Sequence, residues 1–229
     1  MQCAVFPLVA KMGCVDSRVK TPEGELDLRS KEEGLGWTGV QARRAVETLA
    51  LVSRKGRVNV KAWSDAVAAL KLKTQDERHP GVLEDYYAFF KEGQEDYSTK
   101  LLQLLALLLC WERGNTKARL LFELYDQNYG LTLSREAVEE MLRDLLHVAI
   151  QLQANLVAVE EAKEYLKWLS AWQSRFLADT LMQIMGENAV ISREAFEQQL
   201  SKEPLRQCLT AGSLRLAVYT SLKASQQTS

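Results

Sequence analysis

The chain has 229 residues, which is long enough for one large domain or for two lobes of roughly 100 residues, each with its own core, and we expect two lobes. Apolar residues make up 47% and charged residues 26% of the sequence, which excludes the disordered and fibrous classes. The 29 basic residues nearly balance the 30 acidic ones, so the net charge of −1 gives no electrostatic reason to expect nucleic acid as a partner.

The first 37 residues are expected to be an N-terminal arm that is flexible or bound to a partner. Within it, residues 12–17 read MGCVDS and match the myristoylation pattern. If the mature protein begins at Met12, Gly13 would carry a myristoyl group and Cys14 a palmitoyl group, which together suffice for stable membrane attachment. Because Met1 lies upstream, a chance match is equally open.

Apolar residues recur at helical spacing over most of the chain, and this periodicity predicts an all-α protein. The helices are expected in four helix–loop–helix units, in chain order 39–53 with 61–72, 83–90 with 101–111, 116–125 with 135–146, and 168–185 with 193–200. The breaker-poor segment 146–172 is expected to be helical and to bridge the third and fourth units. The stretch 205–222 is expected to form a helix over a groove in its own lobe, and residues 223–229 a disordered tail.

The loops of the four units share a short pattern. Leu133–Val138 and Ile191–Phe196 both contain Ser-Arg-Glu-Ala between two large apolar residues, and the loops around Val58 and Tyr97 fit more loosely. In each loop an apolar residue is followed by Ser or Asn, which helix starts prefer. The pattern predicts short strands that pair across two loops, each followed directly by a capped helix.

This pattern resembles the EF-hand superfamily. The resemblance is clearest at Leu121–Asn128 and Leu133–Glu136, which are similar to the third hand of calcineurin B and of neuronal calcium sensor proteins. The start Gly13–Arg18, followed by degenerate hands, looks like the N-terminal EF-hand regions of TLD-domain proteins. The resemblance implies four degenerate EF-hand-like units paired into two lobes, 38–111 and 116–222, and a habit of binding protein partners.

The loops depart from a calcium-binding EF-hand at the ligand positions. Such a loop needs oxygen ligands from position 1 onward and a bidentate Glu at position 12. With the apolar residue of each loop at position 8, position 12 is Ala62, Leu101, Ala137 and Ala195. We therefore expect no cofactor.

Only the third loop keeps a carboxylate at position 1, Asp126. The alternative to a metal-free protein is a calcium sensor that uses this loop, with the ligands Asp126, Asn128, Ser134 and Glu136. In a further interpretation, Asp126 and Asn128 hold the loop by accepting hydrogen bonds from backbone amides.

Aromatic residues suggest how a partner could bind. An apolar groove that takes an amphipathic helix is expected to be lined by Trp111, Phe122, Tyr125, Trp168, Trp172 and Phe176, unless these residues fill the core instead. The sequence has no GxGxxG, GxxxxGK[ST] or GxSxG motif, so we do not expect an enzyme. The predicted function is a non-catalytic scaffold or accessory subunit. The four cysteines lack CxxC spacing and Cys110 lies in an apolar run, which favours reduced thiols and a cytoplasmic location, with membrane association through the acylated arm.

Overall fold

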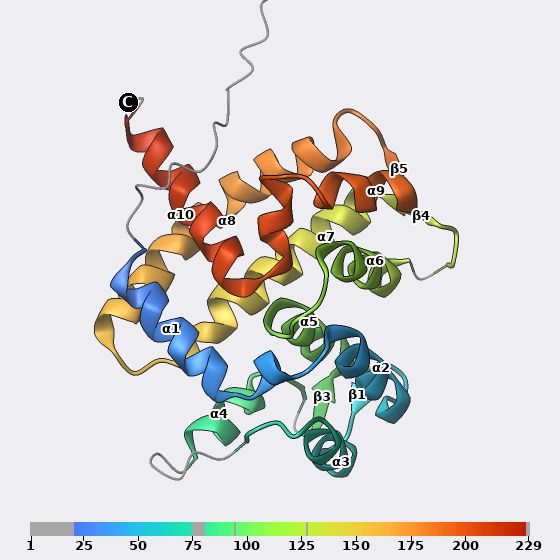
Figure 1. Cartoon of the computed structure of the whole chain (residues 1–229), viewed down its shortest axis with the longest axis vertical. Helices are drawn as coiled ribbons and strands as arrows, with labels where there is room; N and C mark the ends of the chain where they lie inside the picture. Colours follow the sequence, from blue (N-terminus) through green and yellow to red (C-terminus); the bar gives the residue numbers. More distant parts are fainter. Residues whose placement is uncertain (1–20, 75–80, 94, 127, 228–229) are drawn as a thin grey trace, which may run out of the picture.

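The structure of the protein is a computed structural model that describes residues 21–74, 81–93, 95–126 and 128–227 (Figure 1). Gly13 and Cys14 lie outside the described residues. The chain is mostly helical, which confirms the all-α class. The first half contains α1 (Glu23–Gly34), η1 (Trp37–Gly39), α2 (Ala42–Val52), β1 (Arg57–Val58), α3 (Val60–Leu70), α4 (Val82–Ala88), β2 (Lys91–Glu92), β3 (Asp96–Ser98) and α5 (Thr99–Leu109).

The second half repeats the order helix, short strand, helix. It contains α6 (Gly114–Tyr125), β4 (Thr132–Ser134), α7 (Arg135–Leu146), η2 (His147–Gln151), η3 (Leu152–Asn155), α8 (Glu160–Met185), β5 (Val190–Ser192), α9 (Arg193–Leu200), η4 (Leu205–Leu209) and α10 (Ala211–Gln227). Within the described ranges, no helix combines the length and the apolar character that a membrane crossing requires.

The four expected units pair through their loops. Strands β1 and β3 are antiparallel with Val58 opposite Tyr97, and β4 and β5 are antiparallel with Leu133 opposite Ile191. These are the apolar loop residues that the sequence pattern singles out, so the predicted strand pairing is confirmed. Strand β2 adds a third strand on the other side of β3.

Strands β1, β3, β4 and β5 each lead directly into a helix whose first turn is capped. The residue after the apolar strand residue accepts a hydrogen bond from the backbone N–H three positions later, at donor–acceptor distances between 2.9 and 3.5 Å. The four caps and donors are Asn59 with Ala62, Ser98 with Leu101, Ser134 with Ala137, and Ser192 with Ala195. Because a cap satisfies an otherwise unpaired amide, it fixes where the helix begins.

The two lobes share one core, rather than having the separate cores expected from the chain length. Helix α5 carries the run of leucines from Leu101 to Leu109 and is buried on nearly all sides. A helix that is apolar all round needs partners on every face. Figure 1 shows α5 in the middle of the molecule, where it packs against α2 of the first lobe and against α6, α7 and η2 of the second.

The segment 146–172 is not one continuous helix. After α7 the chain makes a π-helical turn and a 3₁₀ turn and then runs extended before α8 begins at Glu160. At this break, side chains donate hydrogen bonds to backbone carbonyls. Gln153 Nε2 donates to Val148 O at 3.0 Å, and Arg215 Nη1 donates to Ala149 O at 3.0 Å. These competing donors come from tertiary contacts, which local sequence does not reveal.

Both ends of the described chain contribute helices to the second lobe. Helix α1 lies in the range expected as an arm, and it packs within the chain itself, against α8 and α10 (Figure 1). The approach is close: a Cβ on Gly24 would lie 2.8 Å from Tyr165 Cβ, so only glycine fits there. Helix α10 packs on α8 and continues to Gln227, through residues expected in a disordered tail.

Candidate functional site

The third loop, at the strand end of the second lobe, is closed by its own carboxylate. Asp126 follows α6, and its two oxygens accept hydrogen bonds from Gly130 N at 2.9 Å and from Leu131 N at 3.0 Å. Tyr129 and Leu131 adopt left-handed backbone angles, with φ of 52° and 55°, which side-chain-bearing residues rarely adopt. Asp126 thus has the amide-binding role that the sequence left open for it.

The other expected calcium ligands do not join Asp126 in one cluster. Ser134 accepts from Ala137 N at 3.2 Å as the cap of α7. The pKa of Glu136 lies below its ordinary value because its carboxylate accepts hydrogen bonds from its own backbone amide and from the Ser134 hydroxyl. Asn128 is exposed and makes no hydrogen bond to another described residue. Two of the four residues therefore serve the start of a helix.

Position 12 of each loop has a second role in this structure. The residues there are the ones whose backbone N–H donates to the cap, namely Ala62, Leu101, Ala137 and Ala195. Across the described ranges, no group of three or more His, Cys, Asp or Glu side chains is arranged to hold a metal ion. The absence of calcium remains a prediction, and its basis is the missing oxygen at position 12.

Replacing Asp126 with Ala is expected to destabilise the third loop, since the Gly130 and Leu131 amides lose their acceptor. The expected loss in free energy of unfolding is about 1–2 kcal/mol, in keeping with two hydrogen bonds to a partly exposed carboxylate. Amide hydrogen exchange should accelerate most at Gly130 and Leu131. Asn128→Ala is the matched control and should leave both amides unchanged; equal acceleration in the two variants would contradict this role for Asp126.

The six aromatic residues expected to line a groove divide into two groups. Phe122, Tyr125 and Phe176 lie in the core, the alternative that the sequence left open. The Phe122 ring packs edge-on against Phe196 with ring centroids 5.5 Å apart, and Tyr125 Oη donates to Asp144 Oδ2 at 2.7 Å. The other three, Trp111, Trp168 and Trp172, reach the surface, so the six do not line one groove.

Helix α8 presents a pair of tryptophans to solvent, which we call the tryptophan face and define as Trp168 and Trp172. Trp168 is 56% exposed and Trp172 is half-buried one helical turn later, with the Arg175 guanidinium 6.0 Å from its ring centroid. Trp111 is 58% exposed but lies apart, between α5 and α6, where its backbone N–H donates to Val40 O. Exposed tryptophans are uncommon on protein surfaces and enriched at interfaces.

A buried charged group, which sequence reasoning missed, ties α1 to α10. Arg215 on α10 is fully buried, and its five N–H groups donate to both oxygens of Glu25, to both oxygens of Glu32 and to Ala149 O, at 2.7 to 3.1 Å. Arg29, half-exposed, also donates to Glu25 at 2.9 Å. Burial raises the pKa of Glu32, although attraction to Arg215 opposes the shift. We call these four side chains the arginine cluster.

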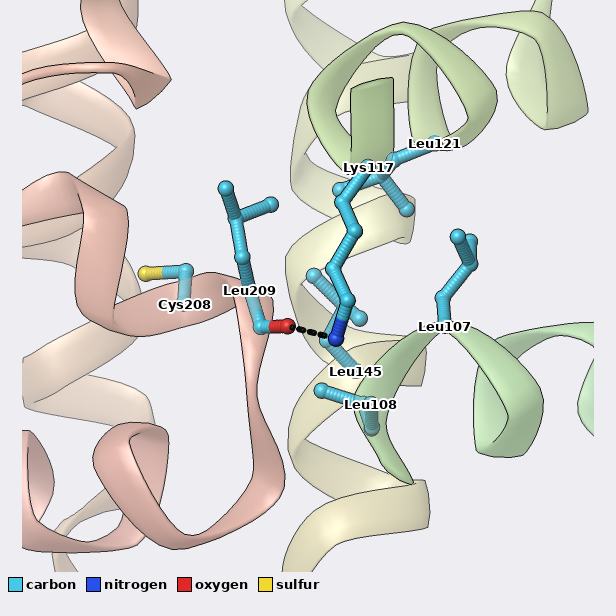
Figure 2. A pocket seen from close by; sticks show the side chains of 7 residues that line it. All are labelled: Leu107, Leu108, Lys117, Leu121, Leu145, Cys208 and Leu209. Atoms are coloured by element: carbon cyan, nitrogen blue, oxygen red, sulfur yellow. Dashed lines mark hydrogen bonds between the residues drawn. The ribbon is translucent and has the colours of Figure 1, made fainter. Parts of the chain in front are cut away.

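A second buried cation links α6 to the segment before α10. Figure 2 shows Lys117 extended among leucine side chains towards the backbone of Leu209, whose carbonyl accepts from Lys117 Nζ at 3.1 Å. Only 3% of Lys117 is exposed. Burial lowers the pKa of Lys117 to about 8, although the nearby Cys110 and Glu112 oppose this.

Two thiols lie close to these buried groups, and neither forms a disulfide bond. Cys110 and Cys208 are both free and buried, as expected of Cys110 from its apolar neighbours. Burial raises the pKa of each thiol to about 12. Both therefore remain protonated at neutral pH, and the protonated thiol is the less reactive form.

The chemistry of these features is that of recognition and packing. The loop carboxylate binds backbone amides, and the buried cations bind carboxylates and a carbonyl within the fold. The tryptophan face brings two large aromatic side chains to one surface of α8. No protein-family model and no curated protein matches the chain.

Proposed function

We propose that the protein is a non-catalytic binding scaffold or accessory subunit, built from four degenerate EF-hand units, that works without calcium. The observation that carries this proposal is the third loop, in which Asp126 binds the amides of Gly130 and Leu131 itself. In a calcium-binding loop the position-1 carboxylate and its neighbours bind the ion instead. Here the loop is already closed by hydrogen bonds of the chain.

The EF-hand relationship is supported by the way the units pair. Two loops meet in each lobe through a short antiparallel strand pair, and each strand leads into the second helix of its unit. The first helix of one unit packs on the second helix of its partner, α2 on α5 and α6 on α9. This is the arrangement expected of paired hands, with alanine or leucine where calcium would need glutamate.

The tryptophan face is the surface that supports partner binding. Binding energy at protein interfaces is concentrated in a few aromatic and arginine anchors, and Trp168, Trp172 and Arg175 offer this combination on one helix. An amphipathic helix with an apolar stripe and an acidic flank fits such a surface. Acylation at Gly13 and Cys14 stays a prediction.

Calorimetric titration of calcium into the full chain, with magnesium present, tests the calcium-independent half of the proposal. No heat and no change in tryptophan emission is expected up to about millimolar calcium, the weak end of EF-hand affinities. Saturable binding in the micromolar range would contradict the proposal and identify a calcium sensor that uses the third loop.

Recovery of partner proteins from cell extract, in buffer with calcium or with chelator, tests the partner-binding part of the proposal. The same proteins are expected in both buffers, and Trp168→Ser combined with Trp172→Ser should reduce their recovery at least tenfold, because two anchors are lost. Tyr129→Ser is the matched control, since Tyr129 is an exposed aromatic residue on the third loop. Equal recovery with all three proteins would exclude the tryptophan face as the binding surface.

A further inference from the structure

The first loop differs from the other three in shape. Arg54 and Arg57 exchange both backbone hydrogen bonds, Arg54 N to Arg57 O at 2.8 Å and Arg57 N to Arg54 O at 3.1 Å. Lys55 and Gly56 between them have left-handed φ angles of 53° and 77°. These are the features of a two-residue hairpin turn, which requires positive φ at both central residues. We call residues 54–57 the basic hairpin.

The hairpin is held in place by the sheet behind it. Val58 is buried and pairs with Tyr97, Arg57 lies opposite Ser98, and Gly56 O accepts from Thr99 N at 3.1 Å. These contacts hold the turn in a fixed position beside β3 and the start of α5.

Exposed cationic side chains concentrate on and next to this turn. Arg54, Lys55 and Arg57 in the turn and Lys61 in the first turn of α3 are all exposed, and residues 51–61 contain no carboxylate. Acidic side chains lie on the neighbouring strands and loop, as Glu92, Glu95 and Asp96, and farther along α2 and α3, as Glu47 and Asp65. Arg57 Nε lies 3.7 Å from Glu92 Oε2, and both side chains are about half exposed. Within the described residues, no ion pair involves the other three cations.

Two aliphatic side chains flank the hairpin in solvent. Leu51, in the last turn of α2, is 86% exposed, and Val60, at the start of α3, is 52% exposed. Aliphatic side chains beside several cations are typical of segments that rest on membranes, because the apolar groups enter the headgroup region while the cations meet anionic lipids.

We propose that the basic hairpin docks the first lobe onto an anionic phospholipid surface, with Leu51 and Val60 entering the interface. The match is one of charge: the three cations of the hairpin, with Lys61 in the first turn of α3, face a layer of negative headgroups. This inference goes beyond the proposed scaffold function, because it uses a different lobe from the tryptophan face and needs neither calcium nor acylation. The attraction falls with ionic strength, since both partners are exposed to water.

Flotation of the full chain with lipid vesicles tests the proposal. The protein is made in a host that does not acylate it, so that Gly13 and Cys14 contribute nothing. It is expected to float with vesicles of phosphatidylcholine and phosphatidylserine in equal parts, but not with phosphatidylcholine alone, and less at high salt. Arg54→Gln, Lys55→Gln and Arg57→Gln together should weaken binding roughly 100-fold, because each cation near an anionic surface contributes about 1 kcal/mol.

The matched control removes three exposed cations elsewhere, with Lys163→Gln, Lys167→Gln and Lys202→Gln, and should float like the wild type. Leu51→Ser should weaken binding several-fold without loss of stability, since Leu51 is almost fully solvent-exposed. Circular dichroism confirms that each variant is folded. Failure of the wild type to float with anionic vesicles at low salt would overturn the proposal, and so would equal losses in the two triple variants. Either result leaves the tests of the scaffold function untouched.

Discussion

Arg215→Met is expected to lower the free energy of unfolding by about 3–5 kcal/mol, because it leaves two buried carboxylates without their cation. Glu25 and Glu32 are buried in α1, and they accept four hydrogen bonds from the Arg215 guanidinium. Methionine fills similar space but donates nothing. Urea unfolding at neutral pH, followed by circular dichroism and by tryptophan emission, measures the loss.

The matched control replaces all three buried members of the cluster, Glu25→Leu and Glu32→Leu together with Arg215→Met. Without any buried charge, this variant should regain most of the stability that the single variant loses, since a packed apolar group often equals a buried ion pair. A loss below about 1 kcal/mol in Arg215→Met would show that the carboxylates find water or protons instead, and that the cluster does not hold α1.

Lys117 is expected to make stability depend on pH with an unusual sign. The folded-state pKa of Lys117 is about 8, below the value of about 10.4 in an unfolded chain. Between these two values the unfolded state binds more protons, so the free energy of unfolding contributed by Lys117 rises with pH. The full rise is roughly 3 kcal/mol and is complete above the unfolded-state pKa.

The measurement compares the wild type with Lys117→Met across this pH window. The thiols of Cys110 and Cys208 act in the opposite direction, because their pKa values are raised to about 12 and stability is lost as pH rises above the ordinary thiol value. Both proteins contain these thiols, so the effect of Cys208 cancels in the difference, whereas that of Cys110 cancels only in part because Lys117 lowers its pKa. Lys117→Met should be at least as stable as the wild type at neutral pH and should fall behind as pH rises. A constant difference would contradict a lowered pKa for Lys117.

Sequence reasoning succeeded where local signals determine the structure. In the third and fourth loops an apolar residue is followed by serine, as Leu133–Ser134 and Ile191–Ser192. This order predicts a strand residue followed by a helix cap, and the helices begin at Arg135 and Arg193 as expected. A cap acts within one turn, so its effect is readable from adjacent residues. The same holds for Asp126, whose hydrogen bonds reach only four and five residues along the chain.

Sequence reasoning failed where a residue's environment is set by a distant segment. Glu25 and Glu32 look like surface residues of a polar segment, and their partner Arg215 lies more than 180 residues away. The available signal was on α10, where Arg215 lies in the stripe of buried apolar residues formed by Ala211, Leu214, Val218 and Leu222. A cation in such a stripe requires a buried anion.

The groove expectation failed for a related reason. Phe122, Tyr125 and Phe176 are large aromatic residues, and size alone does not distinguish an interface residue from a core residue. Trp168 could have been separated from them by its neighbours, because Glu164 and Ala171, one helical turn away on the same face of α8, are polar or small. Helix-face analysis therefore predicts exposure better than residue type.

The central position of α5 has a consequence for how the molecule can meet a partner. Since the same leucines pack on α2 and on α6, α7 and η2, swinging one lobe away from the other would expose them to water. The shared core therefore holds the two lobes in one fixed arrangement, unlike two domains joined by a flexible linker. A ligand that contacted both lobes would therefore lose little binding free energy to ordering the protein.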